Sequence, residues 1–322
     1  MTKPKIYITR KLPEENIQIL KDQADVEMWD DEWKPVPKDI LFEKIKQADG
    51  VLTMLTERVD KNFFDQAPHL KIVANMAVGY DNIDIQEAQK RGIITTNTPD
   101  VLTETTADLT FALMMATARR LIEASEYVKA GQWKNWGPFL LAGKDLYGKT
   151  VGIVGMGRIG AAVAKRCKGF DMNILYHNRS RDPEAEQEYD ASYVSFEDLL
   201  KASDFVVCLT PLTNETEGMF NQQAFELMKN DAVFVNVGRG PVVDEQALYE
   251  ALKTGEIGGA GLDVFSEEPI QQDHPLLSLK QAVILPHIGS ASIDTRNAMI
   301  DLAVKNLHQV LIENKPPVTP IK

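Results

Sequence analysis

Several features are scarce in this chain of 322 residues, and each scarcity excludes a class of protein. It contains two cysteines, Cys167 and Cys208, whose spacing matches no metal-binding or redox motif. Cys208 lies in the apolar run FVVCL and Cys167 in a helical pattern, so we expect both to be buried packing thiols. Nowhere do about 18 apolar residues follow one another without a charge, so no membrane span is expected.

Positive charge is also in short supply. The chain has 35 Lys and Arg against 47 Asp and Glu, which gives a net charge of −12, and no basic cluster offsets this total. The basic surface that nucleic-acid binding requires is therefore absent. The N-terminus, MTKPKIYITRK, runs into a strand pattern without the apolar core of a signal peptide. We expect a cytoplasmic protein with no nucleic-acid and no membrane partner.

Short apolar runs alternate with amphipathic stretches along the chain, which favours α/β crossover units and parallel sheets. The strand candidates are KIYIT, GVLTM, KIVANM and GIITTN, and after Lys149 TVGIVG, NILY, DFVVCL, AVFVNV, IGGAGLDV and AVILP. One long helical pattern covers residues 103–131, and a second ends before Pro316-Pro317. The fold class predicted is therefore α/β, with two doubly wound Rossmann-like domains.

A glycine motif marks the start of the second set of strands. Gly155, Gly157 and Gly160 have the spacing G-x-G-x-x-G, after the strand TVGIV and before the helix RIGAAVAKRC. In this context the first glycine permits a tight turn, the second lets a pyrophosphate approach the backbone, and the third lets helix and strand pack closely. The motif predicts a dinucleotide site with the helix N-terminus facing the anion.

The stretch ILYHNRSRD lacks the acidic residue that usually holds the ribose 2′-hydroxyl of NAD. Asn178 stands there instead, 18 residues beyond Gly160, and Arg179 and Ser180 follow it. A guanidinium pairs with phosphate through charge-assisted hydrogen bonds, whereas a carboxylate would repel it. The stretch therefore favours the 2′-phosphate of NADPH, with NADH as a weaker second cofactor.

Three later segments each end a buried strand with charged residues. VFVNVGRGPVVDE carries Arg239, GLDVFSEEP carries Asp263, Glu267 and Glu268, and VILPHIGSAS carries His287. Ligands of parallel α/β sheets bind at the carboxyl ends of the strands, so these groups could converge there. An Arg that fixes a carboxylate, a His that supplies a proton and a Glu that holds the imidazolium suit the reduction of a 2-oxo acid.

With these segments the chain resembles the D-isomer-specific 2-hydroxyacid dehydrogenases nearly from end to end. The resemblance rests on the motifs already quoted and on VGYDNIDIQEAQKRGI and TETTADLTFALMMATAR, and it is greatest to glyoxylate/hydroxypyruvate reductases. It implies a substrate-binding domain of residues 1–99 plus 290–322 and a dinucleotide-binding domain of residues 100–289. It also implies an active site in the cleft between the two domains.

The resemblance further implies roles for individual residues. The family's catalytic Arg, Glu and His fall on Arg239, Glu268 and His287. NADPH would donate hydride to the C2 carbonyl carbon while His287 protonates the oxygen, and Glu268 would keep His287 in its acid form. Arg239 would polarise the carbonyl and pair with the substrate carboxylate, which the backbone N–H groups of Val78 and Gly79 would also bind.

The cofactor and subunit contacts follow from the same resemblance. The segments that match the family's dinucleotide-binding motifs supply Thr106, Met156, Arg158, Ile159, Thr210, Pro211, Val237, Asp263, Gly289 and Ser290, the last also near the substrate. Trp136 would reach the substrate site of a partner subunit or pack in the dimer interface. The family implies a homodimer, and no metal is expected.

Together these features predict an NADPH-preferring reductase that converts glyoxylate to glycolate and hydroxypyruvate to D-glycerate. A D-lactate-type or broad 2-oxo-acid reductase is the nearest alternative. A more distant one is a dinucleotide-sensing protein without turnover, because the family includes transcriptional corepressors. A phosphoglycerate dehydrogenase with a regulatory extension is disfavoured because the chain ends at Lys322, and a formate dehydrogenase is disfavoured because Glu268 is present.

Overall fold

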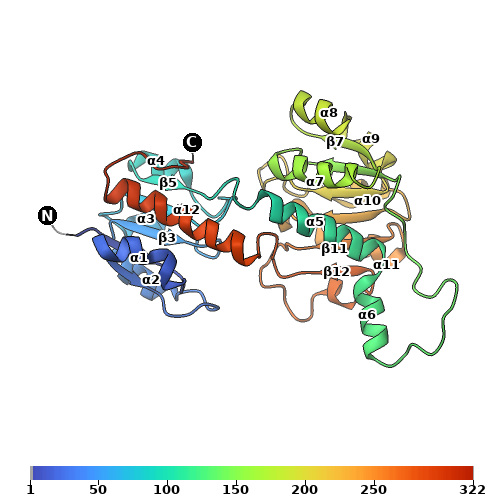
Figure 1. Cartoon of the computed structure of the whole chain (residues 1–322), viewed down its shortest axis with the longest axis horizontal. Helices are drawn as coiled ribbons and strands as arrows, with labels where there is room; N and C mark the ends of the chain where they lie inside the picture. Colours follow the sequence, from blue (N-terminus) through green and yellow to red (C-terminus); the bar gives the residue numbers. More distant parts are fainter. Residues whose placement is uncertain (1–2, 322) are drawn as a thin grey trace. The chain divides into compact units, whose positions relative to one another are not determined.

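The computed structural model describes residues 3–321 and divides the chain into two compact units (Figure 1). Unit 1 consists of the chain up to Leu102 together with the segment from Ala291 onward, and unit 2 is Thr103–Ser290. Each unit has its own parallel sheet with helices packed against it, so the predicted fold class is confirmed.

Unit 1 contains a five-stranded sheet in which every neighbouring pair of strands is parallel. In spatial order the strands are β2 (Asp25–Met28), β1 (Lys5–Ile8), β3 (Gly50–Thr53), β4 (Ile72–Asn75) and β5 (Ile94–Thr96). Its helices are α1 (Glu14–Gln23), α2 (Lys38–Ile45), α3 (Lys61–Asp65), α4 (Ile85–Lys90) and α12 (Ile293–Leu311). The strand order reverses between β1 and β3, and the carboxyl ends of strands at such a point commonly bind ligands.

The last helix, α12, returns to unit 1 and packs against α1, β3 and β4. Gly50 makes this close packing feasible, because a Cβ there would lie 2.6 Å from Leu311 Cδ1 and 2.9 Å from Leu307 Cδ2. Local sequence pattern does not indicate which unit receives this helix. The contacts of α12 are what join the two ends of the chain in one unit.

Unit 2 contains a seven-stranded parallel sheet. In spatial order the strands are β12 (Ala282–Ile284), β11 (Gly259–Leu262), β10 (Val233–Asn236), β9 (Phe205–Cys208), β6 (Thr150–Val154), β7 (Asn173–His177) and β8 (Ser192–Tyr193). The α-helices are α5 (Thr103–Ala118), α6 (Leu121–Lys129), α7 (Arg158–Lys168), α8 (Pro183–Tyr189), α9 (Phe196–Ala202), α10 (Gln222–Glu226) and α11 (Glu245–Thr254), with 3₁₀ turns η1 (Gly240–Val242) and η2 (Pro275–Ser278). The order reverses between β6 and β9, as in dinucleotide-binding sheets.

The central strands of unit 2 are covered on both faces. Every residue of β9, β10 and β11 is buried, as their uninterrupted apolar sequences predict. Both thiols are also buried, Cys208 on β9 and Cys167 on α7, and burial raises the pKa of Cys167 to about 12 and that of Cys208 to about 11. Within residues 3–321, no helix is both long and apolar enough to pass through a bilayer.

The long helix predicted over residues 103–131 is wrong in one respect, because the chain breaks it into α5 and α6. Arg120 takes a left-handed conformation with φ of +52°. The carbonyl of Ala118 accepts a hydrogen bond from the N–H of Lys144 at 2.8 Å, so a returning loop occupies the acceptor at the end of α5. Two strands were not predicted: β2, which alternates exposed and half-buried residues, and the two-residue β8.

Candidate active site

The glycine loop lies between β6 and α7. Gly155 has φ of +104°, and a Cβ on it would lie 2.8 Å from the backbone of Leu209 and Thr210. A Cβ on Gly160 would lie 2.4 Å from the carbonyl oxygen of Gly155, so α7 packs directly on the loop. A Cβ on Gly157 would meet nothing within 4 Å. Gly155 therefore permits the tight turn, Gly160 permits the close packing of α7, and Gly157 leaves the backbone open to a ligand. This combination fits a dinucleotide site.

Helix α7 begins without a capping side chain, because its N-cap is Gly157, and its first turn contains no acidic residue. The N–H groups of Ile159 and Gly160 have no hydrogen-bond acceptor within residues 3–321. Met156 is buried and Arg158 is exposed at the first helical position. Unpaired N–H groups at a helix N-terminus fit the negative charge of a pyrophosphate.

Asn178 joins the end of β7 to the glycine loop. Its side-chain oxygen accepts a hydrogen bond from the N–H of Met156 at 2.7 Å, and its side-chain nitrogen donates to the Met156 carbonyl at 2.9 Å. Its own carbonyl accepts from the hydroxyl of Tyr193 at 3.1 Å. This amide was predicted beside the cofactor phosphate, and the structure shows that it also holds the backbone of the loop.

Arg179 and Ser180, which follow, are exposed, and neither side chain has a hydrogen bond or ion pair in the described part of the chain. The neighbouring Arg181, by contrast, pairs with Glu186 at 2.6 Å. The pKa of Glu215 is lowered by a hydrogen bond with Thr213 and, to a smaller extent, by the charge of Arg179. The guanidinium of Arg179 is therefore available to an anionic ligand.

Thr210 and Pro211 lie beside the glycine loop after β9. The nitrogen of Thr210 is 2.8 Å from the position of a Cβ on Gly155, and its carbonyl oxygen is 2.7 Å from that of a Cβ on Gly238. The carbonyl of Pro211 accepts a hydrogen bond from the Thr216 hydroxyl at 2.7 Å. These contacts place the predicted residues after β9 against the turns after β6 and β10.

Three other predicted cofactor residues lie around Gly289. A Cβ there would lie 3.3 Å from Asp263 Oδ2, 3.4 Å from Thr106 Cγ2 and 3.5 Å from Val237 Cγ1. Ser290 follows and is half-buried. The structure thus brings together residues from α5 and from the loops after β10, β11 and β12.

Glu268 and His287 form the hydrogen bond that the sequence predicts. Glu268 Oε2 lies 2.7 Å from His287 Nδ1, and Glu268 Oε1 accepts from the N–H of Phe265 at 3.0 Å. The side chains of His287 and Glu268 are 30% and 37% exposed, so the pair is partly open to solvent. Burial raises the pKa of Glu268, but His287, the N–H of Phe265 and the charge of Arg239 together lower it below its usual value.

Asp263 fixes the backbone that carries His287. Its carboxylate accepts hydrogen bonds from the N–H groups of Ile288 and Gly289, each at 2.8 Å, and its carbonyl accepts from the N–H of His287 at 2.9 Å. His287 has φ of +54°, a left-handed backbone conformation that residues other than glycine rarely adopt. Burial raises the pKa of Asp263, and the two N–H groups and the charge of His287 partly offset this. Asp263 is therefore a positioning residue for the His287 loop.

Arg239 is held by the turn between β10 and η1. The side chain of Asn236 donates to the Arg239 carbonyl and accepts from the N–H of Gly238, each at 3.0 Å. A Cβ on Gly240 would lie 1.8 Å from the carbonyl carbon of Phe265, so this turn packs on the loop that leads to Glu268. Arg239 is close enough to Glu268 for its charge to lower the pKa of that carboxyl.

In unit 1, Val78 and Gly79 follow β4, and side chains hold both of their carbonyl groups. The side chain of Asn97 donates to the Val78 carbonyl at 2.8 Å, and that of Asn75 donates to the Gly79 carbonyl at 3.2 Å. The backbone nitrogens of Val78 and Gly79 donate no hydrogen bond within residues 3–321. A fixed turn with two free N–H groups fits a carboxylate ligand.

A buried polar network, which the sequence did not indicate, supports the adjoining turn. Glu57 is 4% exposed, and its Oε2 accepts hydrogen bonds from the Thr9 hydroxyl at 2.5 Å and the Met54 N–H at 2.7 Å. The side chain of Asn82 donates to the carbonyls of Met54 and Glu57 at 3.2 and 2.9 Å. The only hint in the sequence is that these polar residues follow buried strands.

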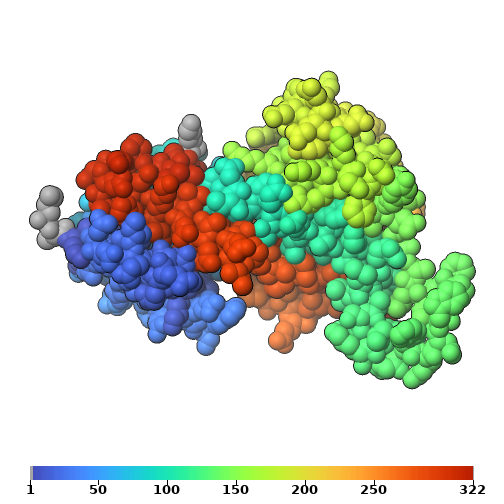
Figure 2. Space-filling model, in the orientation of Figure 1, coloured from blue at the N-terminus to red at the C-terminus, as the bar shows by residue number. Residues whose placement is uncertain are grey.

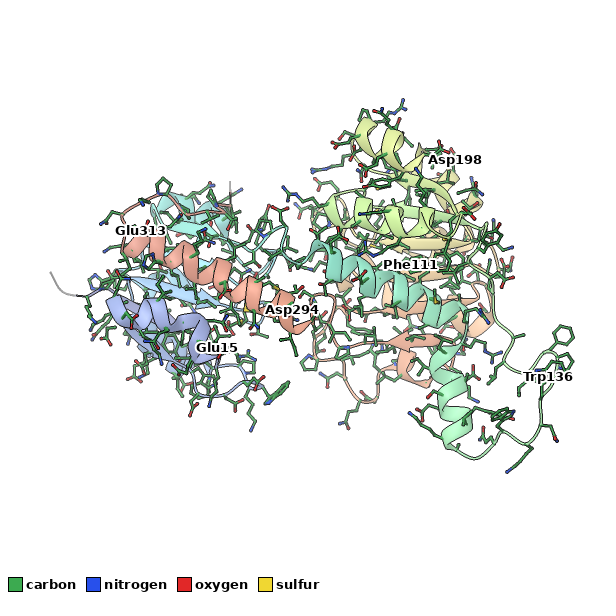
Figure 3. All side chains as sticks on the ribbon, in the orientation of Figure 1. Glu15, Phe111, Trp136, Asp198, Asp294 and Glu313 are labelled. Carbon is green, nitrogen blue, oxygen red and sulfur yellow. The ribbon has the colours of Figure 1, made fainter. Side chains whose placement is uncertain are left out.

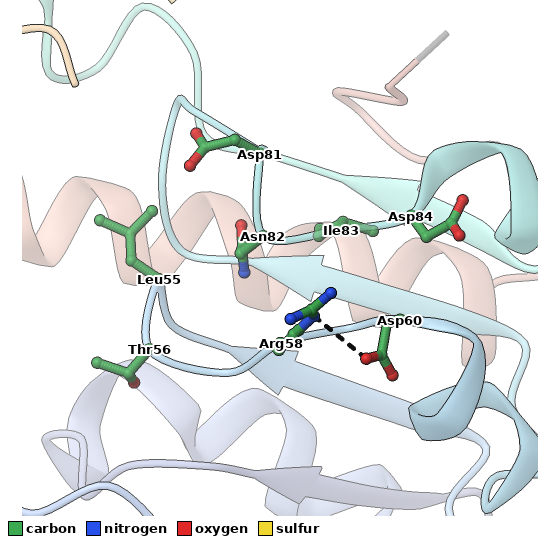
Figure 4. Close-up of a pocket in the computed structure, with 8 residues that line it drawn as sticks. All are labelled: Leu55, Thr56, Arg58, Asp60, Asp81, Asn82, Ile83 and Asp84. Atoms are coloured by element: carbon green, nitrogen blue, oxygen red, sulfur yellow. Dashed lines mark ion pairs between the residues drawn. The ribbon is translucent and has the colours of Figure 1, made fainter. Parts of the chain in front are cut away.

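An open pocket of unit 1 lies beside this turn (Figure 4). Its charged lining consists of Asp60, Asp81, Asp84 and Arg58, and Arg58 pairs with Asp60 at 3.2 Å. Three carboxylates against one guanidinium disfavour the anion of a small acid. We therefore do not assign substrate to this pocket.

Residues 121–147 project from unit 2 and expose apolar side chains (Figure 2). Helix α6 has no buried residue. In the loop that follows, Trp136 is 81% exposed and points outward (Figure 3), and Phe139 is 86% exposed.

Comparison with known proteins agrees with this geometry. The family model described as D-isomer specific 2-hydroxyacid dehydrogenase, NAD binding domain, matches residues 111–289, which is more than half of the chain. The chain belongs to this family. As a member it is an oxidoreductase that uses a nicotinamide dinucleotide, and its matched residues form most of unit 2.

Individual relatives extend the similarity over nearly the whole chain. Glyoxylate reductase of Pyrococcus horikoshii is 54% identical over 309 residues, which cover 95% of this chain and 92% of the relative. The TT0316 protein of Thermus thermophilus has a TM-score of 0.92 and 43% identity, with 99% and 100% of the two chains covered. An NADPH-dependent glyoxylate/hydroxypyruvate reductase of Sinorhizobium meliloti, solved with NADP and malonate, has a TM-score of 0.86 and 35% identity, with 99% and 97% covered.

Proposed function

We propose that the chain reduces small 2-oxo acids with NADPH, converting glyoxylate to glycolate and hydroxypyruvate to D-glycerate. The observation that carries the proposal is the 2.7 Å hydrogen bond between Glu268 and His287 near the charge of Arg239. Relatives named glyoxylate reductase, at about half identity over nearly the full length, support this substrate class.

The residues of the chain divide the work as follows. His287 holds a proton and transfers it to the carbonyl oxygen of the substrate, and Glu268 stabilises the positive charge of the imidazolium beforehand. Arg239 pairs with the substrate carboxylate and polarises its carbonyl. The N–H groups of Val78 and Gly79 bind the same carboxylate. When bound, the nicotinamide supplies the hydride that reduces the carbonyl carbon.

The preference for NADPH rests on the loop after β7. The Arg179 side chain makes no hydrogen bond or ion pair among the described residues, and no carboxylate stands at residues 178–180 to repel a phosphate. We assign the 2′-phosphate to Arg179 and Ser180 and the pyrophosphate to the N-terminus of α7.

We also propose a homodimer that covers the exposed apolar surface of residues 121–147. Trp133, Trp136 and Phe139 are each more than half exposed, and a patch of this kind is typically an interaction surface. Trp136 is the residue of this surface that we assign to the partner's substrate site. Sedimentation equilibrium tests the proposal, and the mass of a single chain would contradict it.

Steady-state kinetics on glyoxylate, hydroxypyruvate and pyruvate, each with NADPH and NADH, tests the proposed function. We expect the highest kcat/KM with NADPH and with glyoxylate or hydroxypyruvate. A clear preference for pyruvate would instead indicate a D-lactate-type reductase. Tight dinucleotide binding without turnover of any of the three acids would contradict the proposal and indicate a sensor.

A further inference from the structure

The loop of residues 178–182, which carries Arg179, is held by hydrogen bonds at both of its ends. At its start, the Asn178 amide is bonded to Met156 and the Asn178 carbonyl to the hydroxyl of Tyr193. At its end, the N–H of Asp182 donates to the hydroxyl of Tyr176 at 2.7 Å. The loop therefore has little freedom at the two positions that flank Arg179 and Ser180.

The hydroxyl of Tyr176 is itself held by a carboxylate. Tyr176 is fully buried in β7, and its hydroxyl donates to Glu186 Oε1 at 2.6 Å. Glu186, on α8, also accepts from Arg181 Nε at 2.9 Å and from Arg181 Nη2 at 2.6 Å. A bidentate guanidinium pair has a defined geometry as well as charge, so Arg181 and Asp182 are both fixed to α8 and β7.

The pairing of Arg181 also separates the two arginines of the loop by role. The Glu186 carboxylate neutralises Arg181, whereas Arg179 has no ion pair among the described residues. The end of the loop at Arg181 therefore adds no unpaired positive charge. The guanidinium of Arg179 lies between Asn178 and Asp182, the two positions that hydrogen bonds hold.

We propose that Tyr176, Glu186 and Arg181 form a latch that sets the selectivity for NADPH by holding Arg179 and Ser180 in position for the 2′-phosphate. This inference rests on the proposed use of NADPH. We assign these three as positioning residues, because their hydrogen bonds join the loop to β7 and α8. Because an anion gains most from groups that are ordered before it binds, a released loop should lose affinity for the 2′-phosphate in particular.

The test compares the dissociation constants of NADPH and NADH, measured by fluorescence titration without substrate, in Tyr176→Phe and Arg179→Ala. Tyr176→Phe removes one oxygen, and we expect the NADPH over NADH affinity ratio to fall about five- to tenfold, as for the loss of one hydrogen bond that orders a charged group. Amide exchange of Asp182 in the cofactor-free protein should become faster. Tyr189→Phe, on the same α8 but outside the loop, serves as the control and should leave the ratio unchanged.

The outcomes separate the latch from the proposed function. If Arg179→Ala leaves the ratio unchanged, the assignment of the 2′-phosphate is wrong. If Arg179→Ala lowers the ratio but Tyr176→Phe does not, or weakens both cofactors equally, the latch is wrong and the assignment stands. Should Tyr176→Phe not fold, Glu186→Gln, with its partly exposed side chain, tests the latch by the same ratio.

Discussion

The surroundings of Glu268 both raise and lower the pKa of its carboxyl group. Burial favours the neutral acid, whereas the hydrogen bond and charge of His287, the Phe265 N–H and the charge of Arg239 favour the carboxylate and lower its pKa overall. A folded-state pKa below the unfolded value stabilises the folded protein above the unfolded pKa, and this contribution is lost as the pH falls through the folded pKa. At neutral pH the carboxylate is therefore charged and able to stabilise an imidazolium.

Glu268→Gln removes this charge and keeps the shape of the side chain. Reduction needs the protonated imidazole that the Glu268 carboxylate stabilises, so the pH profile of kcat/KM for reduction should move to lower pH. Glu267→Gln is the matched control, because Glu267 accepts a hydrogen bond from Gln271 and not from His287. An unshifted profile in Glu268→Gln would remove Glu268 from the mechanism.

At this scale the sequence identified the charged residues but not the groups that hold them. Arg239, His287 and the pair Glu267 and Glu268 could be picked out because each follows a buried strand of a parallel sheet, and the family resemblance then selected Glu268. The second role of Asn178 and the anchoring of Arg179 through Tyr176 depend on contacts across the fold. A local sequence pattern does not predict contacts between distant residues, so these were found only in the structure.

The glycine loop and α7 form the element that receives the dinucleotide, and two of its glycines differ in what surrounds them. A Cβ on Gly160 would lie 2.4 Å from the Gly155 carbonyl, which belongs to backbone and cannot easily move. Gly157 has φ of −97° and ψ of −162°, an extended conformation open to any residue, and nothing lies within 4 Å of its missing Cβ. Gly160 is therefore required for the packing of α7, whereas Gly157 leaves space for a ligand to approach the backbone.

Gly157→Ala and Gly160→Ala should therefore have different effects. In the cofactor-free protein, Gly160→Ala should lower Tm by several degrees, because α7 must shift away from the loop. Gly157→Ala should leave this Tm unchanged and weaken NADPH binding about tenfold or more, since the methyl group occupies the approach to the backbone. Differential scanning fluorimetry and NADPH titration measure both. Wild-type NADPH affinity in Gly157→Ala would contradict the placement of the cofactor.

Buried elements were predictable, and elements decided by distant residues were not. The strands β9, β10 and β11 follow directly from their apolar sequences. The break between α5 and α6 was missed because the group that satisfies the Ala118 carbonyl comes from Lys144. The edge strand β2 was missed because its exposed positions weaken the apolar pattern.

At the scale of the whole molecule, the proposed functions are divided between the two units. Unit 2 carries the glycine loop and the Arg239, Glu268 and His287 side chains, and unit 1 carries the free N–H groups of Val78 and Gly79. Alternation of strands and helices predicted both sheets. A helical pattern does not reveal its packing partner, so the return of α12 to unit 1 was expected only from the family resemblance, which grouped residues 290–322 with the first domain.

The most direct test of the central claim is the kcat of His287→Ala for glyoxylate at saturating NADPH, with the NADPH dissociation constant measured on the same sample. If His287 donates the proton, kcat should fall about 10²- to 10⁴-fold while NADPH binding is retained. His274→Ala, which removes a histidine paired with Glu245, should keep the wild-type rate. A His287→Ala variant with wild-type kcat, or one that only loses NADPH binding, would contradict the mechanism.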